Sequence, residues 1–228
     1  MIASMMPTQN YDLQLLRAQI AATAARMIAQ DGADYATARK KAARQVMGVD
    51  QLQPNLMPDN AEIEEEVRRY RALFGGTAHA ERLLALRQTA LQVMDALAEF
   101  RPHLTGAVLN GTAGEHDDIH LQLFADSAKE VEIFLLNRNV TIDISETPHF
   151  KGARHDPVET VSFLWHKEAV HAELYDFHDL RGALKPRGDG RLQRVDAAGL
   201  RALMATDQSL EQDECRKIES WPPWRPWR

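Results

Sequence analysis

The residues most able to do chemistry lie between positions 109 and 124, LNGTAGEHDDIHLQLF. Gly111 and Thr112 lead through a short polar turn to Asp118, after which polar and apolar residues alternate. A two-residue period is typical of a half-buried strand, so Asp118 and His120 are expected on one face of it. A carboxylate at the start of such a strand can bind a divalent cation beside a phosphate.

A second alternating segment, VHAELY at 170–175, has Glu173 at its centre and His171 on the same face. A second carboxylate on a neighbouring strand would complete the ligands of a hard cation. Asp143, on another predicted strand, and Glu132, in an amphipathic helix, compete for this role. We expect Glu173, because its strand belongs to a hairpin that can lie beside the first strand.

These motifs resemble those of the nucleotidyltransferase superfamily, the polymerase-beta-like fold. That family carries an apolar residue, Gly, and Gly or Ser, then a strand with two alternating carboxylates, and a third carboxylate on a later strand. The matching segments here are Leu109–Thr112, Asp118–Leu121 and Ala172–Leu174. The resemblance covers roughly residues 105–205, less than half of the chain.

The resemblance implies a function and a set of roles. A nucleoside monophosphate would pass from a nucleoside triphosphate to an acceptor, which could be a small molecule, an RNA or a protein. Asp118, His120 and Glu173 would be the metal-binding and catalytic residues, with Mg²⁺ or Mn²⁺ as the ion. Gly111 and Thr112 would position the triphosphate through backbone N–H groups and a hydroxyl.

Two residues depart from the family pattern. Thr112 stands where Ser is usual and still supplies a hydroxyl. His120 stands where the second carboxylate is expected, and magnesium prefers oxygen ligands. Each site residue also has a purely structural interpretation: Asp118 can cap the turn before the strand, and Gly111-Thr112 can form an ordinary tight turn.

Three alternative functions therefore stay open. A catalytically degenerate nucleotidyltransferase fold would bind nucleotide or a partner without turnover. A metal-dependent hydrolase would use Asp118, His120, His171 and Glu173, with zinc, manganese or iron. A scaffold or regulatory protein would bind a protein partner, for example through the Trp/Pro/Arg-rich segment WPPWRPWR at 221–228.

Composition excludes several classes of protein. Of the 228 residues, 44% are hydrophobic and 26% are charged, as in an ordinary globular protein. A formal net charge of −6 argues against a generic nucleic-acid coat. A single cysteine, Cys215, excludes an internal disulfide and suggests a reducing, cytoplasmic location. We expect no transmembrane segment, because no apolar run approaches roughly 20 residues.

Helical patterns fill the first hundred residues. Apolar residues recur at helical spacing from Leu16 to Met27. A second helix is predicted over 35–47, with Gly48 as its C-terminal cap. Asp59 and Glu62 form a capping-box pattern before a third helix, and a long fourth helix ends before Pro102.

The period then changes from helix to strand. Strands are predicted over 105–109, 118–124, 140–144, 159–165 and 170–177. Ser127 and Glu130 form a second capping-box pattern, which begins a helix between two of these strands. Asp196 is expected to cap a short helix over 197–204.

The sequence thus predicts an α+β protein. A helical bundle domain over 1–102 would precede a small mixed α/β domain of nucleotidyltransferase type over 103–210. Residues 211–228 would form a C-terminal tail rich in Trp, Pro and Arg.

Overall fold

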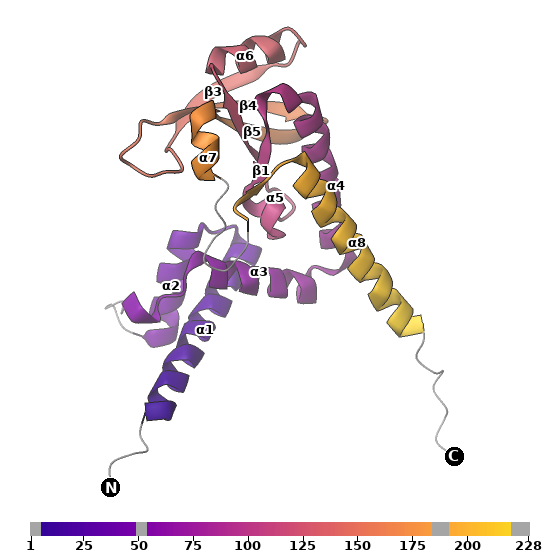
Figure 1. The fold of residues 1–228 in the computed structure, drawn as a ribbon. Coiled ribbons are helices and arrows are strands. Elements are labelled where there is room, and N and C mark those ends of the chain that lie inside the picture. The colour runs from indigo at the N-terminus through magenta and orange to yellow at the C-terminus, as the bar shows by residue number, and fades with distance from the viewer. Residues whose placement is uncertain (1–5, 49–53, 184–191, 220–228) are drawn as a thin grey trace. The chain divides into compact units, whose positions relative to one another are not determined.

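The computed structural model describes residues 6–48, 54–183 and 192–219. The chain combines α-helices with a six-stranded mixed sheet, which confirms the predicted α+β class (Figure 1). Contacts divide the chain into two compact units. Residues 1–83 and 110–117 form the first, here called the helical unit, and residues 84–109 and 118–228 form the second, the sheet unit.

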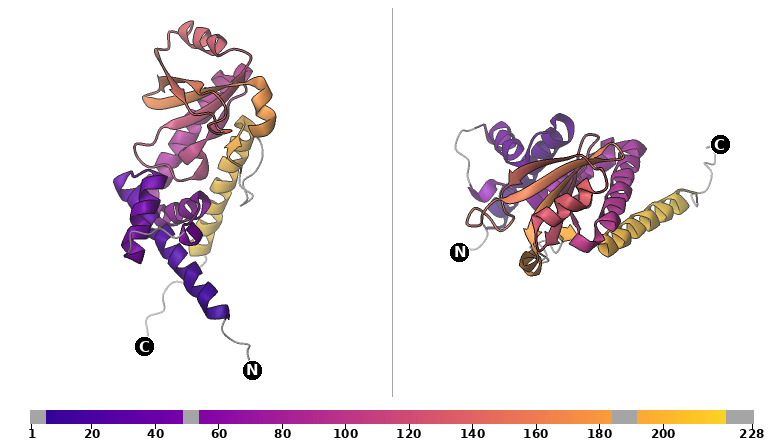
Figure 2. Two further views of the ribbon diagram at one scale, coloured as in Figure 1. Left: turned by 90° about the vertical axis from the view of Figure 1, so that its left-hand side faces the viewer. Right: turned by 90° about the horizontal axis from the view of Figure 1, so that it is seen from above.

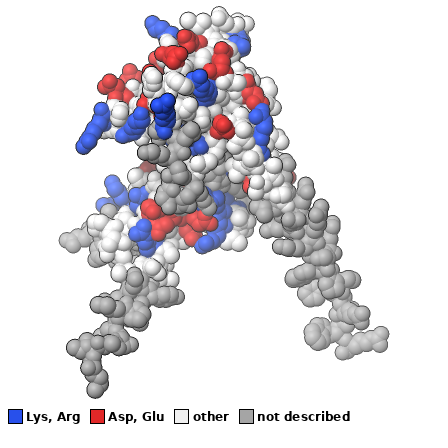
Figure 3. Space-filling model, viewed as in Figure 1, with Lys and Arg blue, Asp and Glu red and all other residues white. Residues whose placement is uncertain are grey.

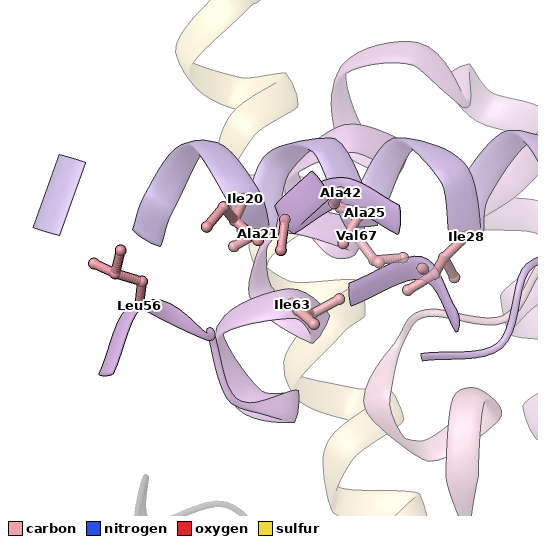
Figure 4. Packing of buried hydrophobic residues seen from close by; sticks show 11 residues of the cluster. Ile20, Ala21, Ala25, Ile28, Ala42, Leu56, Ile63 and Val67 are labelled. Carbon is pink, nitrogen blue, oxygen red and sulfur yellow. The ribbon is translucent and has the colours of Figure 1, made fainter. Parts of the chain in front are cut away.

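Long helices build the helical unit. They are α1 (Met6–Asp31), α2 (Tyr35–Met47), α3 (Asn60–Phe74) and the first part of α4 (Gly76–Ala96), with a short 3₁₀ turn, η1, at Pro54–Leu56. Alanines let α1 and α2 approach closely, and Ala24, Ala38 and Ala42 are fully buried. Figure 4 shows Ile63 of α3 and larger side chains of α1 completing this apolar cluster.

The helix ends follow the predicted local signals. Gly48 ends α2 in the left-handed conformation, with a φ of 66°. Asp59 accepts a hydrogen bond from the backbone N–H of Glu62, whose side chain accepts one from the backbone N–H of Asp59, which confirms the capping box. The same glutamate pairs with Arg17 of α1, with 2.6 Å between Nη2 and Oε2. One residue therefore both caps α3 and links it to α1.

The sheet unit contains all six strands. They are β1 (His103–Thr105), β2 (Ile119–Ala125), β3 (Ile142–Thr147), β4 (Val158–Trp165), β5 (Glu168–Asp176) and β6 (Arg194–Val195). Their order across the sheet is β3-β4-β5-β2-β1-β6, and only β2 and β5 pair in parallel. The predicted adjacency of the two motif strands is therefore confirmed.

The two faces of β2 differ in polarity over its first residues. On β2, Ile119, Leu121 and Leu123 point to one side and are fully buried. His120 and Gln122 point to the other side, as the alternation predicts. Helix α6 (Ala128–Leu136) packs against β2 and β3 and lies next to the sheet in both views of Figure 2.

Shorter helical segments connect these elements. They are the 3₁₀ turn η2 (Ala98–Phe100), α5 (Gly106–Asn110), the 3₁₀ turn η3 (Phe177–Asp179) and α7 (Leu180–Ala183), and the chain ends in α8 (Ala197–Glu219).

The strand predicted over 105–109 is wrong, because only Thr105 of this range belongs to a strand and α5 follows at once. Gly106 has a φ of 74°, a conformation that ends β1 and that other residues adopt only with strain. The buried Arg87 guanidinium then donates to the carbonyls of Val108 and Leu109, at 3.0 and 3.2 Å. Five residues were too few for periodicity to separate strand from helix.

Two further predictions at helix ends need correction. Ser127 precedes α6 but makes no capping hydrogen bond through its side chain, so the second capping box is absent although the helix is present. Asp196 caps α8 as expected, accepting from the Gly199 N–H at 2.8 Å. That helix continues to Glu219 instead of ending at Met204.

Candidate functional site

Asp118 lies immediately before β2 and is held by a histidine of β5. Its Oδ2 lies 3.1 Å from His171 Nε2, and the Asp118 side chain is 45% exposed. A carboxylate only accepts hydrogen bonds, so the proton of this contact belongs to Nε2. The carboxylate is therefore oriented by the imidazole and still reaches solvent.

The other nitrogen of the same imidazole is also engaged. His171 Nδ1 lies 2.8 Å from Ser162 Oγ of β4, and in a neutral ring Nδ1 accepts the hydroxyl proton. Asp118, His171 and Ser162 thus form one hydrogen-bonded chain across three elements. Such a chain fixes the tautomer of the ring and can relay a proton. Sequence reasoning missed Ser162, whose only signal was its place on a predicted strand.

His120 lies directly opposite His171 in the parallel pairing of β2 and β5. The two rings stack with 5.1 Å between their centroids and 25° between their planes. His120 is exposed, while His171 is partly buried. Asp118 and two imidazoles therefore meet on one face of the sheet.

Glu173 takes part in a different set of contacts. Its Oε2 accepts hydrogen bonds from Gln122 Nε2 at 2.9 Å and from the Tyr175 hydroxyl at 2.7 Å. Burial, together with the neighbouring Glu173, raises the pKa of Tyr175 above its ordinary value. The tyrosine therefore stays protonated and donates to the carboxylate.

The same polar chain extends to β6. Arg194 Nε donates to Gln122 Oε1 at 2.6 Å, and the arginine side chain lies over the Phe150 ring, 4.5 Å from its centroid. Burial lowers the pKa of Arg194, which is only 5% exposed. Gln122 thus bridges a buried cation and Glu173, and this chain ties β6 to the centre of the sheet.

The strand register does not bring Glu173 to Asp118. Glu173 pairs with Gln122, four residues beyond Asp118 along β2. At a rise of about 3.3 Å per residue, the two positions are roughly 13 Å apart along the strands. The residue of β5 that does reach Asp118 is His171. The predicted sharing of one cation by Asp118 and Glu173 is not supported by this geometry.

The other acidic candidates lie apart from Asp118. Asp143 of β3 is exposed and pairs with Ser162, so it lies in the same cross-strand row as His171 but two strands from it. Glu132 of α6 lies near Glu159 of β4. Burial, with Glu132 as the second cause, raises the pKa of Glu159.

Gly111 and Thr112, the predicted triphosphate-binding pair, belong to the helical unit. Thr112 is 3% exposed, and its side chain lies close enough to Tyr35 of α2 to influence the pKa of that tyrosine. This contact gives the threonine a structural role in holding α2. Its role toward a phosphate stays a prediction.

A metal centre fits these side chains poorly as they are arranged. Within the described residues, no group of three or more His, Cys, Asp or Glu side chains has the geometry to hold a metal ion. Both ring nitrogens of His171 are engaged, and Glu173 lies elsewhere. One carboxylate, Asp118, is the group that can contact a cation carried by a triphosphate, since Mg²⁺ needs only one or two protein carboxylates in such complexes.

The charges on one face of the sheet unit indicate no particular class of partner (Figure 3). On the side of the sheet unit shown in Figure 3, Lys and Arg are interspersed with Asp and Glu. Among the described residues, no helix is both long enough and apolar enough to cross a membrane. The Trp-rich segment predicted as a partner-binding tail, residues 221–228, lies outside the described residues.

Comparison with known proteins identified no relative of this chain. No family model, curated protein or solved structure matches this chain.

Proposed function

We propose that the sheet unit is a nucleotide-binding domain of nucleotidyltransferase type, in which Asp118 contacts the cation of a magnesium–nucleoside triphosphate complex. The observation that carries the proposal is the meeting of Asp118, His120 and His171 on neighbouring parallel strands, on the polar face of the sheet. In the family that the motifs resemble, this position holds the triphosphate.

The residues around Asp118 would have distinct roles. The bound cation would neutralise phosphate charge. His171 orients Asp118 through its Nε2–H, and Ser162 fixes the ring from the other side. His120, exposed beside them, would donate a hydrogen bond to a phosphate oxygen. Glu173, Gln122 and Arg194 would hold β5, β2 and β6 in register without touching the ligand.

The proposed domain could be an active nucleotidyltransferase or a catalytically degenerate one that only binds nucleotide. The geometry favours the degenerate form. An active nucleotidyltransferase stabilises the charge that develops on the departing pyrophosphate with cations held by several carboxylates. Here His120 replaces one carboxylate, and Glu173 lies roughly 13 Å along the strands from Asp118. Binding is therefore expected without nucleotidyl transfer.

Calorimetric titration of the full chain with ATP and Mg²⁺, run beside a pyrophosphate-release assay, tests the proposal. Binding without release is the expected result. Release of pyrophosphate with any acceptor would show the active form of the same function. No binding of any nucleoside triphosphate would refute both forms.

A further inference from the structure

The helical unit contains a cavity of about 580 Å³ where α3 meets α4, within the usual range for small-molecule sites. Its aromatic wall is formed by Tyr70 and Phe74, whose ring centroids lie 4.6 Å apart. Phe74 is 71% exposed, although phenylalanine side chains are usually buried. The cavity therefore offers a ring surface to a ligand.

The cavity also has a cationic wall, which is formed by Arg71 and Arg82. The Arg71 side chain is only 12% exposed, and its Nε is buried without a hydrogen-bond partner. Its ion pair with Asp117 is long, 3.9 Å from Nη2 to Oδ2. A buried guanidinium with such incomplete pairing costs free energy that an added anion would offset.

The position of Arg71 depends on a glycine. A Cβ added to Gly114 would lie 2.8 Å from Nη1 and 3.0 Å from Nη2 of Arg71. The guanidinium therefore lies flat against the backbone at this residue, and any larger side chain would displace it. Gly114 is also held in place, because its N–H donates to Asp117 Oδ2.

Two further titratable groups line the cavity. Glu115 is exposed, and its carboxylate would repel an anion. His79 lies on α4, and burial, with a smaller effect of Arg71, lowers its pKa, so the ring is neutral at pH 7. Two guanidinium groups and one exposed carboxylate line the cavity, and Asp117 beside Arg71 offsets part of the positive charge.

We propose that this cavity binds a small planar anion, an aromatic ring that carries a phosphate or carboxylate group. The planar guanidinium of Arg71 matches two oxygens of such a group, and the Tyr70–Phe74 wall contacts the ring. This site is independent of the nucleotide site proposed above, because all of its lining residues belong to the helical unit.

Titration of the full chain with phenyl phosphate and with benzoate, followed by NMR chemical shifts, tests the proposal. Benzyl alcohol serves as the neutral ring and inorganic phosphate as the anion without a ring. One or both aromatic anions should bind, and more tightly than either control. The comparison of the two probes shows which anionic group the cavity prefers. Absence of binding by both up to about 10 mM would overturn the proposal.

Variants then assign the binding to the cavity. Arg71→Met keeps the length of the side chain and should weaken binding of the aromatic anion by about tenfold or more. Arg69→Met, at an exposed position of the same helix, should change nothing. Equal affinities in the two variants would overturn the proposal.

Two substitutions at exposed positions keep the test valid if Arg71→Met fails to fold. Phe74→Ala should weaken the aromatic anions but not inorganic phosphate, and Glu115→Gln should tighten all anions. No effect of either substitution would count against the site. Asp118→Ala should leave this binding intact, which separates it from nucleotide binding in the sheet unit.

Discussion

Asp118 and His171 lie 3.1 Å apart, Oδ2 to Nε2, although 53 residues separate them in the chain. The parallel pairing of β2 with β5 creates this contact, and it defines the candidate site. The residue that reaches Asp118 is thus an imidazole where the family pattern led us to expect a carboxylate.

Asp118→Ala is expected to abolish binding of ATP with Mg²⁺ while changing the melting temperature little. The side chain is nearly half exposed, and polar contacts between groups of such exposure contribute only about 0–1 kcal/mol to stability. Calorimetric titration and thermal unfolding measure the two quantities. Asp126→Ala, at an exposed position just after β2, is the matched control. A large loss of stability in Asp118→Ala would instead support a turn-capping role.

Glu173→Gln is expected to lower the free energy of unfolding by about 1–3 kcal/mol, because two hydrogen bonds to a charged carboxylate become weaker hydrogen bonds to a neutral amide oxygen. Two donors, from Gln122 and Tyr175, converge on one oxygen of this carboxylate. Urea denaturation measures the effect, with Glu99→Gln at an exposed position as control. ATP binding should persist. If binding disappeared and stability stayed the same, Glu173 would be a ligand-binding residue after all.

Ala42→Leu is expected to destabilise the helical unit by about 1–3 kcal/mol, since Ala42 is fully buried where α2 packs on α1. The neighbouring Lys41→Leu lies on the exposed side of α2 and should have a much smaller effect. Circular dichroism during denaturation compares the two. Equal effects would mean that α2 is not packed as described.

His103 should make stability depend on pH in the acidic range. Burial lowers its pKa below the ordinary value of 6.5, and its Nδ1–H donates to the Arg101 carbonyl at 2.9 Å. Below pH 6.5 the unfolded chain binds a proton that the folded chain does not, so stability falls as pH decreases toward the lowered pKa.

The variant His103→Gln isolates this contribution. The difference in melting temperature between wild type and variant should shrink as pH falls from 7 toward the lowered pKa, because only the wild type loses stability by this route. A difference that stayed constant over the range would show that His103 does not titrate differently in the folded state.

Local sequence signals predicted several elements well. The helix over 35–47 has the predicted bounds, and the capping box of Asp59 and Glu62 is present. The hairpin of β4 and β5 also lies where alternation placed it. These features depend on contacts between residues close in sequence, so composition and spacing contain most of the information. The prediction of a strand over 105–109 was wrong, and local signals could not reveal that Arg87 donates hydrogen bonds to two carbonyls of α5, which lie 21 and 22 residues later in the chain.

The sequence by itself determined that Asp118 and His120 share one strand face and that a second polar strand carries His171 and Glu173. The alternation of side chains on each strand requires this. Only the tertiary structure decided which of the two β5 residues meets Asp118, because the relative shift of two parallel strands is set by packing along their whole length. That shift places His171 beside Asp118 and places Glu173 in contact with Gln122 and Tyr175.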